Sequence, residues 1–325
     1  MIQVAVVCGG YSGEYDISLK SADCVMAELR KKRYACYKIV IGRDGWMLWE
    51  GKKKYEVNRH DFSVQRGKDK LTFDVVYNIV HGTPGEDGKL QGYWDMLGLP
   101  YTSPGVMVSA LTMNKYITKL VCKSKGMKVA KGVLLKDTDK VVNVDKLAEK
   151  LNFPFFVKPN HGGSSVATVK CYSKEEAVAA IEAAFGHDRE VIVEQYVKGR
   201  ELTCGVYKDE KGEVQALPVT EIVPHNDFFD YEAKYEGKSD EITPARIGKK
   251  WYKKTQESAC KIYELLHIDG LVRIDFILRA DDLYFMEVNT IPGFSKASIV
   301  PQQIRAAGKK ESDILDMLIR QALQG

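Results

Sequence analysis

Residues 2–30 read IQVAVVCGGYSGEYDISLKSADCVMAELR. The run Ile2–Val7 is apolar and rich in β-branched residues, which is typical of a buried strand, and Gly9-Gly10 ends it. Asp16 or Ser18 can then cap a helix whose apolar residues share one face, namely Ala22, Val25, Met26 and Leu29. The order strand, glycine turn, helix predicts the first unit of an α/β fold.

The same alternation continues to about residue 100. Cys36–Ile41 and Val75–Val80 are further short apolar strands, and Gly88–Leu97 has helical spacing. Strands that alternate with helices form parallel sheets, so we expect an open parallel sheet in this part of the chain. The turn-rich segment PYTSPG at 100–105 marks a boundary, and we assign residues 1–104 to an N-terminal α/β domain.

Two further domains are expected. Residues 105–197 carry a helix at 113–126, strands at 132–135, 155–158 and 190–195, and an Ala-rich helix that opens with a capping box at 173–176. Residues 198–325 form an α+β part with two antiparallel hairpins (201–218 and 271–288) and helices at 249–266 and 313–323. A polar loop at about 224–247 is long enough to suggest a functional lid.

The composition is that of an ordinary globular protein. The chain has 325 residues, 45% hydrophobic and 28% charged, with a net charge of +4. This excess is too small to indicate a nucleic-acid partner, and no apolar run reaches the ~18 residues that a membrane span needs. The 7 cysteines are scattered without a CxxC pair, which favours reduced thiols and a cytoplasmic location.

The second hairpin of the last domain carries the clearest chemistry. Arg273 and Asp275 share one face of their strand because they are two residues apart, and so do Glu287 and Asn289. With a three-residue turn at 280–282, Asp275 lies opposite Glu287. Two carboxylates and an amide oxygen then suit Mg²⁺, whereas without a cation the carboxylates repel. The alternative is a solvent-facing hairpin with ordinary polar residues.

A glycine-rich loop elsewhere is a candidate phosphate site. Residues 158–165 read KPNHGGSS and join two predicted strands, with Lys158 supplying a positive charge. The loop lacks GxxxxGK[ST], which excludes the mononucleotide P-loop, and residues 9–13 do not form GxGxxG. Glycine beside serine is more often a plain turn, so this motif is weak alone. Among the histidines we favour His81, which opens the polar stretch HGTPGEDG.

Together these stretches resemble the D-alanine–D-alanine ligases of the ATP-grasp superfamily. The motifs follow the family's order almost end to end: GGYSGE (9–14), HGTPGEDG (81–88), MNK (113–115), KPNHGGSS (158–165), EQYVKGRE (194–201), DYEAKY (230–235), RID (273–275) and EVNTIPG (287–293). The departures are small. Asn114 stands where Asp is common, and residues 160–162 and Ala167 vary the phosphate loop.

The resemblance implies a three-domain ATP-grasp fold, with domains at 1–104, 105–197 and 198–325. It implies a ligase that makes D-alanyl-D-alanine for peptidoglycan, using ATP and two Mg²⁺ or Mn²⁺ ions, in a cytoplasmic homodimer. ATP phosphorylates the carboxylate of the first D-alanine, and the amine of the second displaces phosphate. Two alternatives stay open: a ligase that takes D-lactate or D-serine second, and a nucleotide-binding module that has lost catalysis.

The resemblance also assigns roles by position. The ATP contacts are Lys115, Lys158, Ser164, Glu194, Val197, Glu201 and Lys234, and the metal ligands are Asp275, Glu287 and Asn289. Glu14 holds the ammonium group of the first substrate, Arg273 and the Gly293 amide face the tetrahedral intermediate, and Ser298 anchors the second carboxylate. His81 is a further substrate-binding residue. Ser164 and Tyr235 link to Glu14 and fasten the long loop as a lid.

Overall fold

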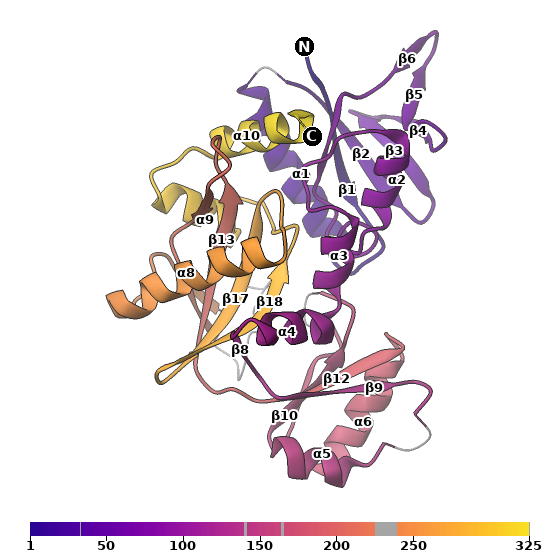
Figure 1. Ribbon diagram of the computed structural model, residues 1–325. Helices are drawn as coiled ribbons and strands as arrows, with labels where there is room; N and C mark the ends of the chain where they lie inside the picture. The colour runs from indigo at the N-terminus through magenta and orange to yellow at the C-terminus, as the bar shows by residue number, and fades with distance from the viewer. Residues whose placement is uncertain (33, 140–141, 164–165, 225–238, 325) are drawn as a thin grey trace.

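The computed structural model describes residues 1–32, 34–139, 142–163, 166–224 and 239–324. These residues form three sheets, each covered by helices (Figure 1). Ser164, Lys234 and Tyr235 lie outside the described residues, and so does most of the expected lid. None of the described helices is long and apolar enough to cross a membrane.

The N-terminal sheet has seven strands in the order β6-β5-β4-β3-β2-β1-β7. Its elements are β1 (Gln3–Gly9), α1 (Tyr15–Arg30), β2 (Ala35–Gly42), β3 (Gly45–Glu50), β4 (Lys53–Asn58), β5 (Ser63–Arg66), β6 (Asp69–Leu71), β7 (Val75–Asn78) and α2 (Lys89–Leu97). β1 pairs in parallel with β2 and β7, as the alternation predicts. The strands from β3 to β6 extend the sheet through antiparallel pairs, so it is mixed. Tight glycine turns at Gly45, Gly51 and Gly67, all with positive φ, allow these hairpins.

Helices from both ends of the chain cover this sheet. α1 and the last helix, α10 (Glu311–Gln324), pack against each other and share one apolar core with β1 and β7. α2 packs on the opposite face, where Trp94 is fully buried. The C-terminal helix therefore returns to the N-terminal sheet, and Figure 1 shows α10 beside α1.

The central sheet has the order β11-β10-β12-β9. Its elements are β9 (Gly132–Lys136), α5 (Val144–Leu151), β10 (Phe155–Pro159), β11 (Val169–Cys171), α6 (Lys174–Phe185) and β12 (Glu190–Gln195). Ser173 caps α6 as predicted, because its hydroxyl accepts a hydrogen bond from the Glu176 amide at 3.2 Å. β10 and β12 pair antiparallel, with Phe156 opposite Glu194, which brings Lys158 and Glu194 close together.

The third sheet has the order β16-β15-β13-β17-β18-β8, with β14 paired to β13. Its elements are β8 (Lys128–Val129), β13 (Arg200–Lys208), β14 (Val214–Ala216), β15 (Thr220–Pro224), β16 (Ser239–Ile242), α8 (Lys249–Leu265), β17 (Val272–Arg279), β18 (Asp282–Asn289) and α9 (Ile299–Ala306). Both expected hairpins are present, as β13–β14 and β17–β18. α8 packs on this sheet through one large apolar core.

The expected helix at 113–126 is α4 (Lys115–Ser124), two residues shorter at each end. A helix that we did not predict, α3 (Val106–Met113), precedes it, and Asn114 separates the two. The Asn114 side chain accepts a hydrogen bond from the Ile117 amide at 2.9 Å, so Asn114 caps α4 at its N-terminus. α3, α4 and β8 all contact β18 of the third sheet, although they fall within the range 105–197. The domain boundaries at 104 and 197 stay our proposal.

Candidate active site

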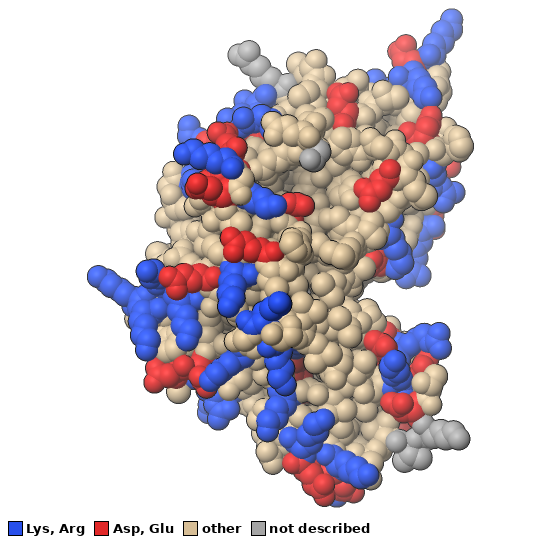
Figure 2. Space-filling model, in the orientation of Figure 1, with Lys and Arg blue, Asp and Glu red and all other residues tan. Residues whose placement is uncertain are grey.

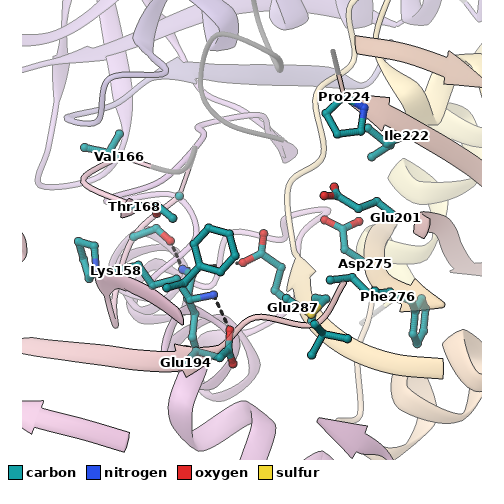
Figure 3. Close-up of a pocket in the computed structure, with 18 of the residues that line it drawn as sticks. Lys158, Val166, Thr168, Glu194, Glu201, Ile222, Pro224, Asp275, Phe276 and Glu287 are labelled. Atoms are coloured by element: carbon teal, nitrogen blue, oxygen red, sulfur yellow. Dashed lines mark hydrogen bonds and ion pairs between the residues drawn. The ribbon is translucent and has the colours of Figure 1, made fainter. Parts of the chain in front are cut away.

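A cavity of about 690 Å³ lies between the central and third sheets. The N-terminal turn Tyr11–Glu14 borders it too, so all three parts of the chain contribute to its walls. Eight of the residues that we predicted line it: Glu14, Lys115, Lys158, Glu194, Val197, Glu201, Asp275 and Glu287. In Figure 3, Lys158 lies on one side of the cavity and the carboxylates of Glu201 and Asp275 on the other.

Lysines from α4 and β10 form the cationic side. Lys158 Nζ donates to Glu194 Oε2 at 2.9 Å, and Lys119 Nζ contacts the other oxygen, Oε1. Burial opposes the charge of Glu194, but Lys119 and Lys158 outweigh it and lower its pKa to about 2. Burial also opposes the charge of Lys158, while Glu194 and Glu287 outweigh it and raise the pKa of this amine. Lys158 is therefore a fixed cation at neutral pH.

The start of the predicted phosphate loop is fastened on two sides. The His161 amide donates to Asp188 Oδ2 at 2.6 Å, and the His161 ring lies 3.0 Å from Asn114 Nδ2. Lys115 Nζ donates to the carbonyl of Gly162. The ring's hydrogen bond to Asp188 raises the pKa of His161. The departures Asn114 and His161 thus contact each other across the loop.

The loop also meets the N-terminal turn. A Cβ placed on Gly163 would lie 3.1 Å from Glu14 Oε2, so the Glu14 carboxylate faces the backbone of the loop directly. Glycine is what permits this close approach between the N-terminal and central parts.

The acidic hairpin has the predicted pairing. Asp275 lies opposite Glu287 and Arg273 opposite Asn289. The turn is shorter than we expected, since Arg279 already pairs with Asp282, and a β-bulge next to Phe276 restores the register. The prediction of the turn was wrong by one residue, and the bulge compensates for it.

Asp275 is the centre of this cluster. It accepts two hydrogen bonds from Arg273, both at 3.0 Å, one from Asn289 Nδ2 at 2.8 Å, and one from the Thr203 hydroxyl. Lys115 Nζ lies 4.0 Å from Glu287 Oε2. In the described part of the chain no three His, Cys, Asp or Glu side chains gather as a metal centre would. The metal ligands that we predicted here are two carboxylates and an amide, Asp275, Glu287 and Asn289.

The loop that follows β18 holds Gly293 and Ser298, two of the predicted substrate residues. His81 Nδ1 lies 2.8 Å from the Ile291 carbonyl, and Glu86 Oε1 accepts from the Ile291 amide at 2.9 Å. Burial and the nearby Glu14 charge raise the pKa of Glu86. His81 is 3% exposed, so it faces this loop rather than the cavity. A Cβ on Gly293 would lie 3.0 Å from Ser298 Oγ, which places these two predicted residues side by side.

Models of two family segments match the chain. The D-ala D-ala ligase N-terminus matches residues 3–104, and the D-ala D-ala ligase C-terminus matches residues 121–320. The D-alanine--D-alanine ligase of Porphyromonas gingivalis is 42% identical over 322 residues, which cover 98% of this chain and 97% of the relative. The enzyme of the same name from Azobacteroides pseudotrichonymphae is 44% identical over 323 residues, 98% of this chain and 99% of the relative.

The chain belongs to the D-alanine–D-alanine ligase family.

Solved structures of similar proteins agree with this assignment to the D-alanine–D-alanine ligases. D-alanyl-alanine synthetase A from Vibrio cholerae has a TM-score of 0.88 at 28% identity, covering 100% of this chain and 99% of that one. The VanG D-Ala:D-Ser ligase from Enterococcus faecalis has a TM-score of 0.86 at 33% identity, covering 98% of both chains. The resemblance and the α/β fold class inferred from the motifs are confirmed.

Sequence reasoning missed several residues of the ligase site. Arg43 and Phe156 line the cavity, and Lys119 holds Glu194 from behind. Lys119 could have been identified from the sequence. It belongs to the buried face of α4 together with Thr118 and Cys122, and a lysine is unusual there. Arg43 follows β2 in an exposed turn, and no local pattern distinguishes it from other surface arginines.

Proposed function

We propose that this chain is an ATP-dependent ligase that joins two D-alanines to D-alanyl-D-alanine, with ADP and phosphate as the other products, for peptidoglycan synthesis. One observation carries the proposal: Lys115 and Lys158 border the same cavity as Asp275 and Glu287. Cations for the phosphates and carboxylates for a divalent metal ion are the two parts that phosphoryl transfer requires. The names of the relatives from two bacteria support the same reaction.

In this proposal ATP fills the cavity between the central and third sheets. Lys115 and Lys158 bind the phosphates together with the backbone at Gly163, while Glu194 and the backbone of Val197 border the base. Glu201, on the opposite wall, accepts from the ribose hydroxyls. The expected roles of Ser164 and Lys234 as further phosphate contacts stay predictions, because both lie outside the described residues.

The acidic hairpin fits Mg²⁺ or Mn²⁺, with two ions expected. Asp275 and Glu287 are paired in register on one face, and the Asn289 side chain adjoins Asp275, which gives a set of oxygen donors. When bound, the ions would neutralise charge on the phosphoryl group being transferred. The bonds from Arg273 and Asn289 hold the Asp275 carboxylate in place for that role.

The substrate groups follow from the remaining contacts. The Glu14 carboxylate, beside Gly163, accepts the ammonium group of the first D-alanine, whose carboxylate oxygen attacks the γ-phosphorus of ATP. Arg273 and the Gly293 amide donate to the negative tetrahedral intermediate formed when the second amine attacks. The Ser298 hydroxyl donates to the second carboxylate. Tyr235 and Ser164, outside the described residues, stay predicted partners of Glu14.

His81 acts in this proposal through the loop after β18. Its ring and the Glu86 carboxylate bind the carbonyl and the amide of Ile291, two residues before Gly293. This contact fixes the direction of the Gly293 amide. His81 is thus a positioning residue for the second half of the reaction.

A second amino acid other than D-alanine is the main alternative. The VanG enzyme, which is similar over almost the whole chain, is named for D-serine as second substrate. Purified protein with Mg-ATP and equal D-alanine, D-serine and D-lactate should yield mainly D-alanyl-D-alanine, identified by mass spectrometry. If the product is mainly D-alanyl-D-serine or D-alanyl-D-lactate, the second substrate is not D-alanine. If no condensation product forms at all, the proposed ligase activity is wrong.

We further propose a homodimer that works in the cytoplasm, where ATP and free D-alanine are available. An apolar surface over α2, α3 and α4 supports the dimer, with its largest exposed side chains at Met96 (81%) and Met107 (65%). In Figure 2 the surface over α3 is free of the red and blue of charged side chains. A helix without charged residues, as α3 is, normally lies buried, which favours a second copy on this face.

A further inference from the structure

A buried lysine, Lys119, contacts Glu194 on the side that faces away from the cavity. Lys119 lies on α4, one turn after Lys115, and its side chain is 5% exposed. Its Nζ contacts Glu194 Oε1, while Lys158 Nζ lies 2.9 Å from Glu194 Oε2. Lys158 and Glu194 line the cavity and Lys119 does not. Lys119 therefore has no direct contact with whatever fills the cavity.

The charges of this cluster do not cancel. One carboxylate stands between two ammonium groups, so the three side chains carry one net positive charge. Because Lys119 is enclosed, the surplus acts outward through Lys158. Without Lys119, Glu194 and Lys158 would form a closed neutral pair, and the ammonium group of Lys158 would have a full counter-charge beside it.

We propose that Lys119 is a positioning residue for ATP: by neutralising Glu194 from behind, it leaves the charge of Lys158 available to the phosphates. It also keeps Glu194 ionised, so that this carboxylate only accepts hydrogen bonds at the end of the cavity assigned to the base. The inference rests on the proposed ATP site and names a residue that none of the motifs contains.

The electrostatics of the cluster agree with this role. Burial lowers the pKa of Lys119 to about 8, with Glu194 opposing the shift and Lys158 adding to it. The charged groups that act on Lys119 are Glu194 from β12, Lys158 from β10 and Glu287 from β18. The surplus charge is thus largely present at pH 7, half lost near pH 8 and mostly lost by about pH 9. Affinity for ATP should weaken over the same range.

The test compares Lys119→Met with Lys119→Arg and with Lys123→Met, a control on the exposed last turn of α4. Affinity for a non-hydrolysable ATP analogue with Mg²⁺ is measured by calorimetry from pH 7 to pH 9.5, and KM and kcat are measured on ATP and D-alanine. Lys119→Met still leaves Glu194 paired with Lys158, so the fold should persist.

We expect Lys119→Met to weaken analogue binding and raise KM for ATP about tenfold at pH 7, with kcat and KM for D-alanine nearly unchanged. Lys119→Arg should bind the analogue like the wild type at pH 7. Its affinity should not fall above pH 8, because the guanidinium group does not deprotonate there. Lys123→Met should match the wild type.

Wild-type affinity in Lys119→Met would overturn the inference. A general loss would overturn it too, seen as lower kcat and melting temperature with an equal rise of KM for ATP and for D-alanine. If Lys119→Met fails to fold, the affinity of Lys119→Arg for the analogue above pH 8 decides. A decline of this affinity equal to that of the wild type would overturn the inference. A wild-type protein that binds the analogue but makes no dipeptide would refute the proposed function alone. A wild-type protein that does not bind the analogue would refute both.

Discussion

Replacing Glu287 by Gln should make the protein nearly inactive while changing its stability without metal very little. Two unit charges about 5 Å apart repel by about 3 kcal/mol at an effective dielectric constant near 20. Removing the charge of Glu287 relieves this repulsion from Asp275, but it also removes the attraction to Lys115 Nζ at 4.0 Å, which is about 4 kcal/mol at the same dielectric constant. Because the two contributions nearly cancel, the melting temperature in chelator should stay within about 3 °C of the wild type.

The activity, in contrast, should fall steeply. Gln keeps the size of the side chain but removes the charge that binds the divalent ion, so turnover with Mg-ATP should fall about 10³-fold. Calorimetry in chelator and ADP release with Mg-ATP and D-alanine measure the two effects. Asp282→Asn is the control: it lies on the same strand, pairs with Lys128 at the surface, and should change neither quantity. A folded variant that turns over like the wild type would refute the paired carboxylates as a metal site.

Three further substitutions test other parts of the site. Lys158→Met should raise KM for ATP at least about tenfold while the protein stays folded, because Lys119 still pairs with Glu194; an unchanged KM would exclude Lys158 from the phosphate site. Gly163→Ala should raise KM for D-alanine more than KM for ATP, because its Cβ would lie 3.1 Å from Glu14 Oε2; the reverse order would count against Glu14 as the ammonium site. The folded-state pKa of His161 is raised from 6.5, so its stabilising contribution is complete below that pH and is lost as the pH rises through the folded pKa. His161→Asn should therefore lower the melting temperature relative to the wild type at pH 6 but hardly at pH 9, and an equal loss at both would show that protonation is irrelevant.

The chemistry of the hairpin was readable because it depends on local spacing. Side chains two residues apart in a strand share a face, so the pairing of Asp275 with Glu287 followed from the sequence. The predicted turn length was wrong. A two-residue turn followed by a β-bulge pairs Asp275 with Glu287 just as a three-residue turn without a bulge would. Hydrophobic periodicity does not distinguish these two solutions.

Strands β3 to β6 were missed for a different reason. β4, β5 and β6 are short and polar or charged at most positions, as in Lys53–Asn58, so they lack the apolar run that marked β1. β3 does carry an apolar run, at 46–49, and was overlooked. Their cohesion comes from an aromatic cluster around Phe62, which draws on Trp46, Phe73 and Tyr93 from separate parts of the chain. Such a cluster depends on tertiary contacts that no window of sequence contains.

The contacts of the loop after β18 could not be predicted from the sequence either. His81 meets Ile291 across 210 positions of sequence, and Glu86 reaches the same residue. The motif HGTPGEDG marked His81 as interesting, but only the fold shows that its partner is a backbone carbonyl. Residues that act through other residues, such as His81 and Lys119, are the ones that sequence reasoning identifies least well.

The central claim is that the carboxylate of one D-alanine is phosphorylated by ATP and that the amine of another then displaces the phosphate. D-Alanine labelled with ¹⁸O in both carboxylate oxygens tests it directly, with mass spectrometry of the phosphate and the dipeptide. The oxygen that attacks the γ-phosphorus leaves with it, so each dipeptide formed should be accompanied by one phosphate carrying one ¹⁸O. Unlabelled phosphate, or phosphate released without dipeptide, would contradict the account.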